Sequence, residues 1–145
     1  MKLKGTDVAP TDNKIVSIVD DEVDVAEIFQ DTLSTRMEGT SLVSFNDPAI
    51  ALDHYKKNVH DYELVIADFR MPNMDGMELL KSVKKLNPKV RTLLMSAYEF
   101  RGNPIFEKYF KDGIIDSYMD KPMTVDGLCQ RVTEEYHIYQ LRSNE

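Results

Sequence analysis

Residues 64–68 read Leu-Val-Ile-Ala-Asp and are followed at residues 69–76 by Phe-Arg-Met-Pro-Asn-Met-Asp-Gly. A short apolar run of this length is typical of a strand buried within a parallel sheet. Asp68 ends the run, so we expect its carboxylate to stand at the mouth of a buried strand. Pro72 and Gly76 indicate a loop between this strand and the next apolar pattern.

Apolar runs of strand length alternate with segments of helical period along the chain. This alternation is typical of a parallel sheet covered by helices on both faces. The expected strands are about residues 14–19, 41–45, 63–67, 90–95 and 117–119. We therefore predict an α/β, doubly wound, flavodoxin-like fold with five parallel strands in the order 2-1-3-4-5 and five helices.

The expected helices carry end signals and apolar spacings. Asp47 is expected to cap the second helix, with Pro48 at its first position, and Asn87-Pro88 to end the third. The fourth is expected from Pro104 to Lys111, with Gly113 as its C-terminal cap. The apolar residues expected on the other helices are Val25, Ile28, Phe29 and Leu33 as one buried stripe in the first, Ile50, Leu52 and Tyr55 in the second, Leu79, Leu80, Val83 and Leu86 in the third, and Val125, Leu128, Cys129, Val132 and Tyr136 in the last, which is expected to run to about Arg142.

Composition bounds the class of protein. A chain of 145 residues with 42% hydrophobic content can bury one sizeable core, so we expect a leader at residues 1–13, one domain at 14–142 and a tail at 143–145. The net charge of −7 disfavours direct binding to nucleic acid, which depends on neutralising phosphates. The single cysteine, Cys129, fits a reducing compartment, and no apolar stretch is long enough to cross a bilayer. We expect a cytoplasmic protein without membrane contact.

Two further groups of residues are expected to be structural. The lysines of the third helix are expected on its solvent face, and a group of aromatic residues is expected mainly in the core rather than in a partner-docking patch. These groups are Lys81, Lys84 and Lys85, and Phe100, Phe106, Tyr109 and Phe110.

Acidic residues follow the first and third expected strands. Asp20-Asp21-Glu22 comes directly after residues 14–19, and Asp68 ends the third strand. Ligand sites of open parallel sheets lie outside the carboxyl ends of the strands where the strand order reverses, here between strands one and three. Because carboxylates in one cleft disfavour each other's ionisation, a positive ion is expected among them, and oxygen ligands suit Mg²⁺.

The ends of the last two strands add a hydroxyl and an ammonium group. Ser96 follows the fourth strand and Lys121 follows the fifth, and both side chains can donate hydrogen bonds to an anion. A metal ion, a cation, a hydroxyl donor and an aspartate nucleophile are the parts from which phosphoryl-transfer sites are built. The pattern therefore indicates phosphate chemistry.

Four motifs together resemble the receiver domain of two-component response regulators. They lie at strand ends in the right order, and the resemblance covers about residues 14–142. The motifs are Val19-Asp20-Asp21-Glu22, Ile66-Ala67-Asp68-Phe69-Arg70-Met71-Pro72-Asn73-Met74-Asp75-Gly76, Met95-Ser96-Ala97 and Tyr118-Met119-Asp120-Lys121-Pro122.

The resemblance implies a role for each matching residue. It makes Asp68 the phosphoacceptor, with Mg²⁺ bound by Asp21, Asp68 and the backbone carbonyl of Arg70, and with Asp20 in the outer shell of the metal through water. Lys121 would contact the phosphoryl group and Ser96 would move to bond it. Tyr118 would swing inward when Ser96 moves, and Pro122 would hold the lysine loop through a cis peptide bond.

The resemblance also implies partners. The phosphoryl group would come from a histidine kinase, a phosphotransfer protein or a small acyl phosphate, and would be lost by hydrolysis. A downstream protein, or a second copy of the chain, would read the state through helix four, strand five and helix five. Such a domain catalyses only its own phosphorylation and dephosphorylation and is not an enzyme acting on an external metabolite.

Some positions depart from the family pattern. Arg70 and Tyr98 lie two residues beyond Asp68 and Ser96, at positions that in this family flank the path of the hydrolytic water, and their bulk is expected to slow dephosphorylation. Ser96 is a smaller variant of the commoner threonine. Residues 98–104 depart most, so the switch surface is expected to be locally remodelled.

Three other functions fit parts of the pattern. A degenerate receiver would be an unphosphorylated scaffold, but the intact set of acids, Ser96 and Lys121 argues against it. An aspartyl-phosphate phosphohydrolase of the haloacid dehalogenase type would need a second acid where Arg70 stands, and a cap domain. A flavodoxin-like FMN carrier would cradle phosphate in its first loop, where Asp20, Asp21 and Glu22 would repel it.

Overall fold

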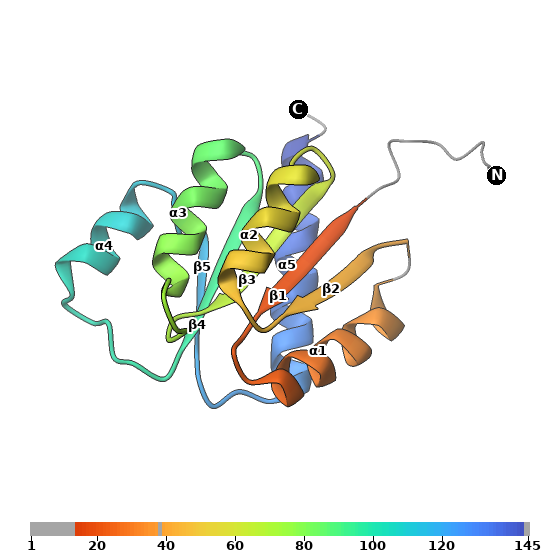
Figure 1. Cartoon of the computed structure of the whole chain (residues 1–145), viewed down its shortest axis with the longest axis horizontal. Coiled ribbons are helices and arrows are strands. Elements are labelled where there is room, and N and C mark those ends of the chain that lie inside the picture. The colour runs from red at the N-terminus through yellow and green to blue at the C-terminus, as the bar shows by residue number, and fades with distance from the viewer. Residues whose placement is uncertain (1–13, 38, 144–145) are drawn as a thin grey trace.

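The computed structural model describes residues 14–37 and 39–143, and shows a central parallel sheet between two layers of helices (Figure 1). The order of the strands is β2-β1-β3-β4-β5, which confirms the predicted doubly wound fold. The strands are β1 (Ile15–Val19), β2 (Ser41–Phe45), β3 (Tyr62–Asp68), β4 (Arg91–Ser96) and β5 (Ser117–Asp120). The expected leader at residues 1–13 and the last two residues of the expected tail lie outside the described residues.

The register of the sheet brings four strand ends to one edge. Val19 of β1 pairs with Ala67 of β3, Asp68 pairs with Met95 of β4, and Ser96 pairs with Asp120 of β5. Because the strands are parallel, the residues that follow them emerge side by side. This edge therefore collects the side chains that the sequence places after each strand.

Each face of the sheet is covered by its own helices. On one side lie α1 (Val23–Arg36) and α5 (Val125–Ser143), whose buried residues include Leu33 and Leu128. On the other lie α2 (Pro48–Lys57), α3 (Gly76–Leu86) and α4 (Pro104–Lys111), with α4 at the outer end beside α3 in Figure 1. All seven residues of β3 are buried because both layers cover this strand.

Side-chain caps fix where three of the helices begin. The carboxylate of Asp47 accepts a hydrogen bond from the Ala49 amide, and the amide oxygen of Asn103 accepts from Ile105 and Phe106. Asp75 and Glu78 form a reciprocal capping box at the start of α3. This box fixes the first turn of α3, which follows the loop after Asp68.

Burial corrects the expected stripe of α1. The buried residues are Ala26, Phe29 and Leu33, whereas Ile28 is 53% exposed. At 3.6 residues per turn, Ile28 lies roughly 200° around the helix from Ala26, so it faces away from the sheet. Ile50 and Leu86 are likewise exposed on α2 and α3.

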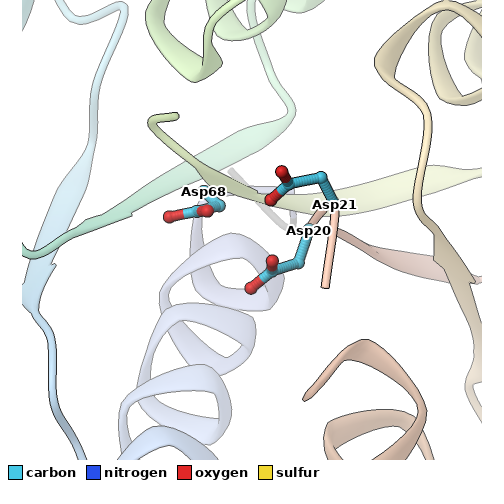
Figure 2. A group of neighbouring side chains, drawn as sticks. All are labelled: Asp20, Asp21 and Asp68. Carbon is cyan, nitrogen blue, oxygen red and sulfur yellow. The ribbon is translucent and has the colours of Figure 1, made fainter. Parts of the chain in front are cut away.

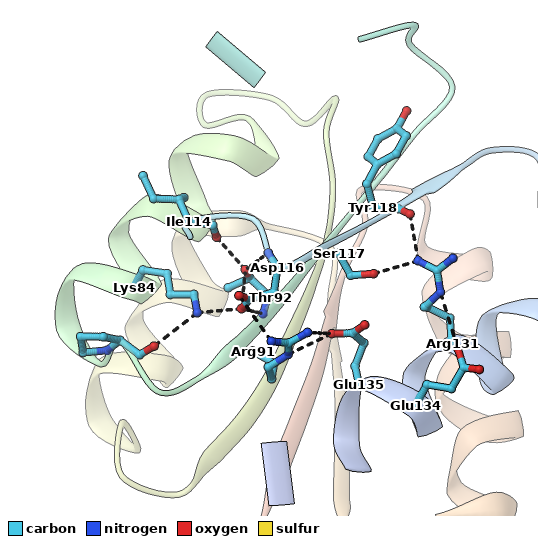
Figure 3. A network of polar contacts seen from close by, with 11 residues as sticks. Lys84, Arg91, Thr92, Ile114, Asp116, Ser117, Tyr118, Arg131, Glu134 and Glu135 are labelled. Atoms are coloured by element: carbon cyan, nitrogen blue, oxygen red, sulfur yellow. Dashed lines mark hydrogen bonds and ion pairs between the residues drawn. The ribbon is translucent and has the colours of Figure 1, made fainter. Parts of the chain in front are cut away.

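Lys84 also differs from expectation, because it is not on a solvent face. Its ammonium lies 2.7 Å from Asp116, which is also 3.6 Å from the guanidinium of Arg91. Arg91 in turn donates two hydrogen bonds to Glu135 of α5, and both of these side chains are buried (Figure 3). This network joins α3, β4, the segment before β5 and α5 at the edge of the sheet opposite the acidic strand ends.

The aromatic segment around α4 is only partly core. Phe100 is 3% exposed and stacks on Phe106 with a centroid separation of 4.9 Å, whereas Phe110 is 47% exposed. α4 contains no fully buried residue. Its bounds agree with the prediction, and Gly113 after it has the positive φ of a C-terminal cap.

Candidate functional site

Three aspartates meet at the carboxyl edge of the sheet. Asp20 and Asp21 follow β1 and Asp68 ends β3, and their side chains converge in Figure 2. One carboxylate oxygen from each lies within 4.8 Å of the others. Asp20 is fully buried, Asp68 is 7% exposed and Asp21 is exposed, so the group reaches from the interior to the surface.

Lys121 supplies the ammonium at this edge. Its Nζ lies 3.1 Å from Asp20 Oδ2 and 3.2 Å from Asp68 Oδ1. Its backbone amide donates to the carbonyl of Ser96, and the peptide bond to Pro122 is cis, as the resemblance implied. The end of β5 therefore carries the lysine to the two buried aspartates.

The electrostatics of the group show a deficit of positive charge. Burial and the neighbouring Asp20 raise the pKa of Asp68, Lys121 opposes them, and the net result is a pKa of about 6. Burial lowers the pKa of Lys121, but Asp20 and Asp68 outweigh that effect, so its pKa is raised overall. One ammonium does not neutralise three carboxylates, and an added cation would stabilise the group.

The donor set fits a hard divalent cation. The three residues offer only carboxylate oxygens, which are the ligands that Mg²⁺ and Ca²⁺ take in proteins. Asp21 and Asp68 could bind such an ion directly, and Asp20, held by Lys121 and the Glu22 amide, could act through water.

A second chain of contacts joins Ser96 to Tyr118 through Tyr98. The Tyr98 amide donates to Ser96 Oγ over 2.8 Å, and the Tyr118 hydroxyl donates to the Tyr98 carbonyl over 3.0 Å. The ring of Tyr118 packs against Phe100 and Phe106. Arg131 of α5 donates to the carbonyl of Tyr118, which fixes β5 beside α5 (Figure 3).

These groups surround one cleft, which we call the acidic cleft. Its volume is about 490 Å³. Of the predicted site residues, Asp20, Tyr118 and Pro122 do not line it; Asp20 is fully buried and accepts a hydrogen bond from Lys121, which does line it. The lining consists of Asp21, Glu22, Asp68, Arg70, Ser96, Ala97, Tyr98 and Lys121.

Two features of the cleft were missed by reasoning from sequence. A Cβ at Gly76 would clash with the backbone oxygen of Asp68, so only glycine allows α3 to start this close to the end of β3. The guanidinium carbon of Arg70 lies 5.4 Å from the ring centroid of Tyr98, a cation–π contact between two residues that line the cleft. The sequence indicates Gly76 as part of a loop, but it does not predict the close approach of this residue to the backbone of Asp68.

The sequence model of the response regulator receiver domain matches residues 16–133, which include both strands of the acidic group, Ser96 and Lys121. The chain belongs to this receiver family. Its relatives include the transcriptional regulatory protein ZraR of Escherichia coli K12, with 35% identity over 81% of this chain and 25% of the relative. The DNA-binding transcriptional regulator NtrC of the same organism is 27% identical over 90% of this chain and 27% of the relative. The receiver thus spans about a quarter of the length of these curated relatives.

Solved receiver structures share the fold. The receiver domain of Francisella response regulator 1452 is 27% identical and superposes with a TM-score of 0.69, covering 85% of this chain and 96% of that one. A response regulator receiver domain protein from Clostridium thermocellum gives a TM-score of 0.73 at 22% identity, over 88% and 98% of the two chains. Within residues 14–37 and 39–143, no helix is long and apolar enough to cross a membrane.

Proposed function

We propose that this receiver accepts a phosphoryl group on Asp68 from a histidine kinase or a phosphotransfer protein. The observation that carries the proposal is the placement of Asp68, whose carboxylate opens into the acidic cleft within 3.2 Å of Lys121 and beside two further aspartates. A carboxylate nucleophile beside a lysine ammonium and a set of oxygen ligands for a metal ion is an arrangement that supports phosphoryl transfer. Family membership adds independent support, because receivers are signalling domains.

The transfer uses residues of the cleft in separate roles. An oxygen of Asp68 attacks phosphorus as the bond to the donor nitrogen or oxygen breaks, and the electron pair leaves with the donor. With a pKa of about 6, Asp68 is mostly ionised at neutral pH and is available as a nucleophile. Lys121 can move from the carboxylates to the new phosphoryl oxygens.

Mg²⁺ is the ion that we assign to the acidic group. Asp21, Asp68 and the Arg70 carbonyl would hold it, with Asp20 acting through water. When bound, it offsets the charge of the carboxylates and of the phosphoryl oxygens. The oxygen-only donor set and the raised pKa of Asp68 support this assignment.

The output is a change at the face formed by α4, β5 and α5. Ser96 Oγ would leave the Tyr98 amide to donate to the phosphoryl group, and this would disturb the Tyr98 carbonyl to which Tyr118 is bonded. The equilibrium of a loosely packed α4 would then shift. A downstream protein or a second copy of the chain would read that shift.

We also propose that Arg70 and Tyr98 slow the hydrolysis of the acyl phosphate. Both line the acidic cleft, where the bulk of their side chains restricts the approach of water. Arg70→Asn combined with Tyr98→Glu should shorten the lifetime of the phosphorylated protein, followed by intact mass. An unchanged lifetime would show that the pair is not a barrier.

The site and the relatives favour a signalling role in the cytoplasm. Several relatives are named as transcriptional regulators, so an effect on transcription is a reasonable output, although the acidic charge of this domain disfavours direct contact with DNA. We place the receiver in the cytoplasm, where kinases that use ATP act. Arg70 stands where a phosphohydrolase would need its second acid, so turnover of an external metabolite is disfavoured.

Incubation with acetyl phosphate and Mg²⁺, followed by intact mass measurement, tests the proposal. Wild type should gain the mass of one phosphoryl group, and the gain should be absent in Asp68→Asn and after chelation of Mg²⁺. Uptake is also expected in Asp112→Asn, because Asp112 lies at the end of α4 and pairs only with Lys108 in the described region. No uptake by wild type would favour a degenerate scaffold instead.

A further inference from the structure

We propose that the guanidinium group of Arg70 leaves the ring of Tyr98 to bind the phosphoryl group on Asp68, so that Arg70 is a second cationic contact of the phosphoryl oxygens beside Lys121. This inference rests on the proposed function, and it gives the Arg70 side chain a binding role distinct from the metal role of its carbonyl. It also makes the Arg70–Tyr98 stack a feature of the unphosphorylated state only.

The first support is the position of the side chain. Arg70 lines the acidic cleft together with Asp68, Ser96 and Lys121. It follows Asp68 by two residues, and the Phe69 amide between them is fixed by a hydrogen bond to the Met95 carbonyl. Its backbone is therefore anchored next to the acceptor, while its long side chain is exposed and free to turn.

The second support is that the guanidinium of Arg70 has no hydrogen-bond or ion-pair partner within the described residues. Within residues 14–37 and 39–143, Arg70 makes no hydrogen bond or ion pair to a protein group, and its guanidinium lies over the ring of Tyr98. Lys121, by contrast, is shared between Asp20 and Asp68. Five N–H donors thus stand beside the position where new acceptor oxygens would appear.

The third support is the charge of the cleft. Asp20, Asp21, Glu22 and Asp68 face Lys121 and Arg70, which leaves two excess negative charges. A divalent ion would balance these charges. Phosphorylation then replaces the single negative charge of Asp68 by a doubly charged phosphoryl group, which adds one negative charge. Arg70 can bind that charge without breaking an ion pair, because it pairs with no carboxylate within the described residues.

The balance between the two contacts favours the phosphoryl group. An exposed ring face holds a guanidinium weakly, whereas charge-assisted bonds from the guanidinium fork to phosphate oxygens are among the stronger polar contacts in proteins. Arg70 should therefore exchange partners when the phosphoryl group arrives. The exchange depends on the planar fork, so lysine would replace arginine only in part.

The exchange has a consequence for the neighbouring groove. A second cavity, of about 510 Å³, lies between α3 and α4 and includes Phe69, Met77, Phe100 and Tyr109 in its lining. Arg70 and Tyr98 line both this groove and the acidic cleft, so their stack is the wall between them. Departure of the guanidinium uncovers the Tyr98 ring. The backbone of the same residue is bonded to two other groups, because its amide donates to Ser96 Oγ and its carbonyl accepts from the Tyr118 hydroxyl.

The test uses beryllofluoride with Mg²⁺ as a phosphoryl mimic and the full chain. Arg70→Ala should weaken beryllofluoride binding roughly tenfold, Arg70→Lys should recover part of the loss, and the difference should shrink at high salt. Arg101→Ala is the matched control, because it removes the same charge from an exposed residue outside the cleft lining. Equal binding by wild type and Arg70→Ala would overturn the inference.

A spectroscopic arm separates the partner exchange from a general effect of charge. The chain contains no tryptophan, so Tyr98→Trp introduces a single emitter at the stack. Beryllofluoride with Mg²⁺ should change its emission and increase its quenching by acrylamide, and Arg70→Ala in the same background should abolish most of this response. An unchanged response without Arg70 would mean that Ser96 alone moves residue 98, which contradicts the inference. Uptake of phosphoryl by wild type, measured by mass in parallel, shows whether the proposed function itself stands.

Discussion

At the scale of single residues, the surroundings of Asp68 are the reason we assign the chemistry to it. The residue ends a strand buried on both faces, and Lys121 bridges its carboxylate to that of Asp20. Its position at a strand end could be predicted from residues 64–68 because a buried apolar run has few alternatives. The contact between Arg70 and Tyr98 could not, because it depends on the conformations of two loops.

Glu63 gives a prediction about pH at this scale. Burial raises the pKa of this carboxyl from 4.5 to about 7, and its Oε1 has no hydrogen-bond partner among residues 14–37 and 39–143. Because the folded pKa lies above the unfolded one, the folded state binds the proton more tightly. The contribution of Glu63 to stability is therefore full below about pH 4.5 and is lost as the pH rises through about 7.

Glu63→Gln should consequently be more stable than wild type at pH 8 by about 1–2 kcal/mol, because the uncharged amide avoids the cost of burying an ionised carboxylate. This advantage should shrink towards pH 5. Urea unfolding at both pH values measures it, with Glu27→Gln on the exposed face of α1 as control. Equal stability of wild type and Glu63→Gln at pH 8 would contradict the account.

At the scale of elements, the local sequence predicts where the helices begin but not which side chains of other elements they contact. The starts of α2 and α4 are indicated by Asp47-Pro48 and Asn103-Pro104, because each pair supplies a cap and a proline suited to the first helical position. Lys84 was placed wrongly because its spacing on α3 carries no information about Asp116, which reaches it from the segment before β5.

A second prediction about stability concerns the contact between Arg91 of β4 and Glu135 of α5. Arg91 and Glu135 are both buried, so Glu135→Ala leaves a guanidinium in the interior without its main partner. The variant should lose about 3–5 kcal/mol of unfolding free energy, measured by urea titration. Asp126→Ala, which breaks an exposed pair with Arg36, should change stability little. Similar losses in both variants would show that the buried link is not special.

At the scale of the whole molecule, the parallel sheet is the device that makes the site. Its order brings the ends of β1 and β3 together and sets those of β4 and β5 beside them, so residues distant in sequence share one cleft. The alternation of strand and helix patterns, together with the polar residues that follow each strand, predicts this arrangement because a parallel sheet brings the residues after its strands to one edge. Side-chain partnerships such as the stack over the cleft follow from packing, which no single segment specifies.

The central claim is that Asp68, and no other residue, carries a phosphoryl group. Borohydride reduces an acyl phosphate to the alcohol, so peptide mapping after treatment with acetyl phosphate, Mg²⁺ and borohydride locates the modified residue. We expect homoserine at position 68, lost when Mg²⁺ is chelated and absent from Asp68→Asn. Reduction at another carboxylate, or none in a folded wild-type sample, would contradict it.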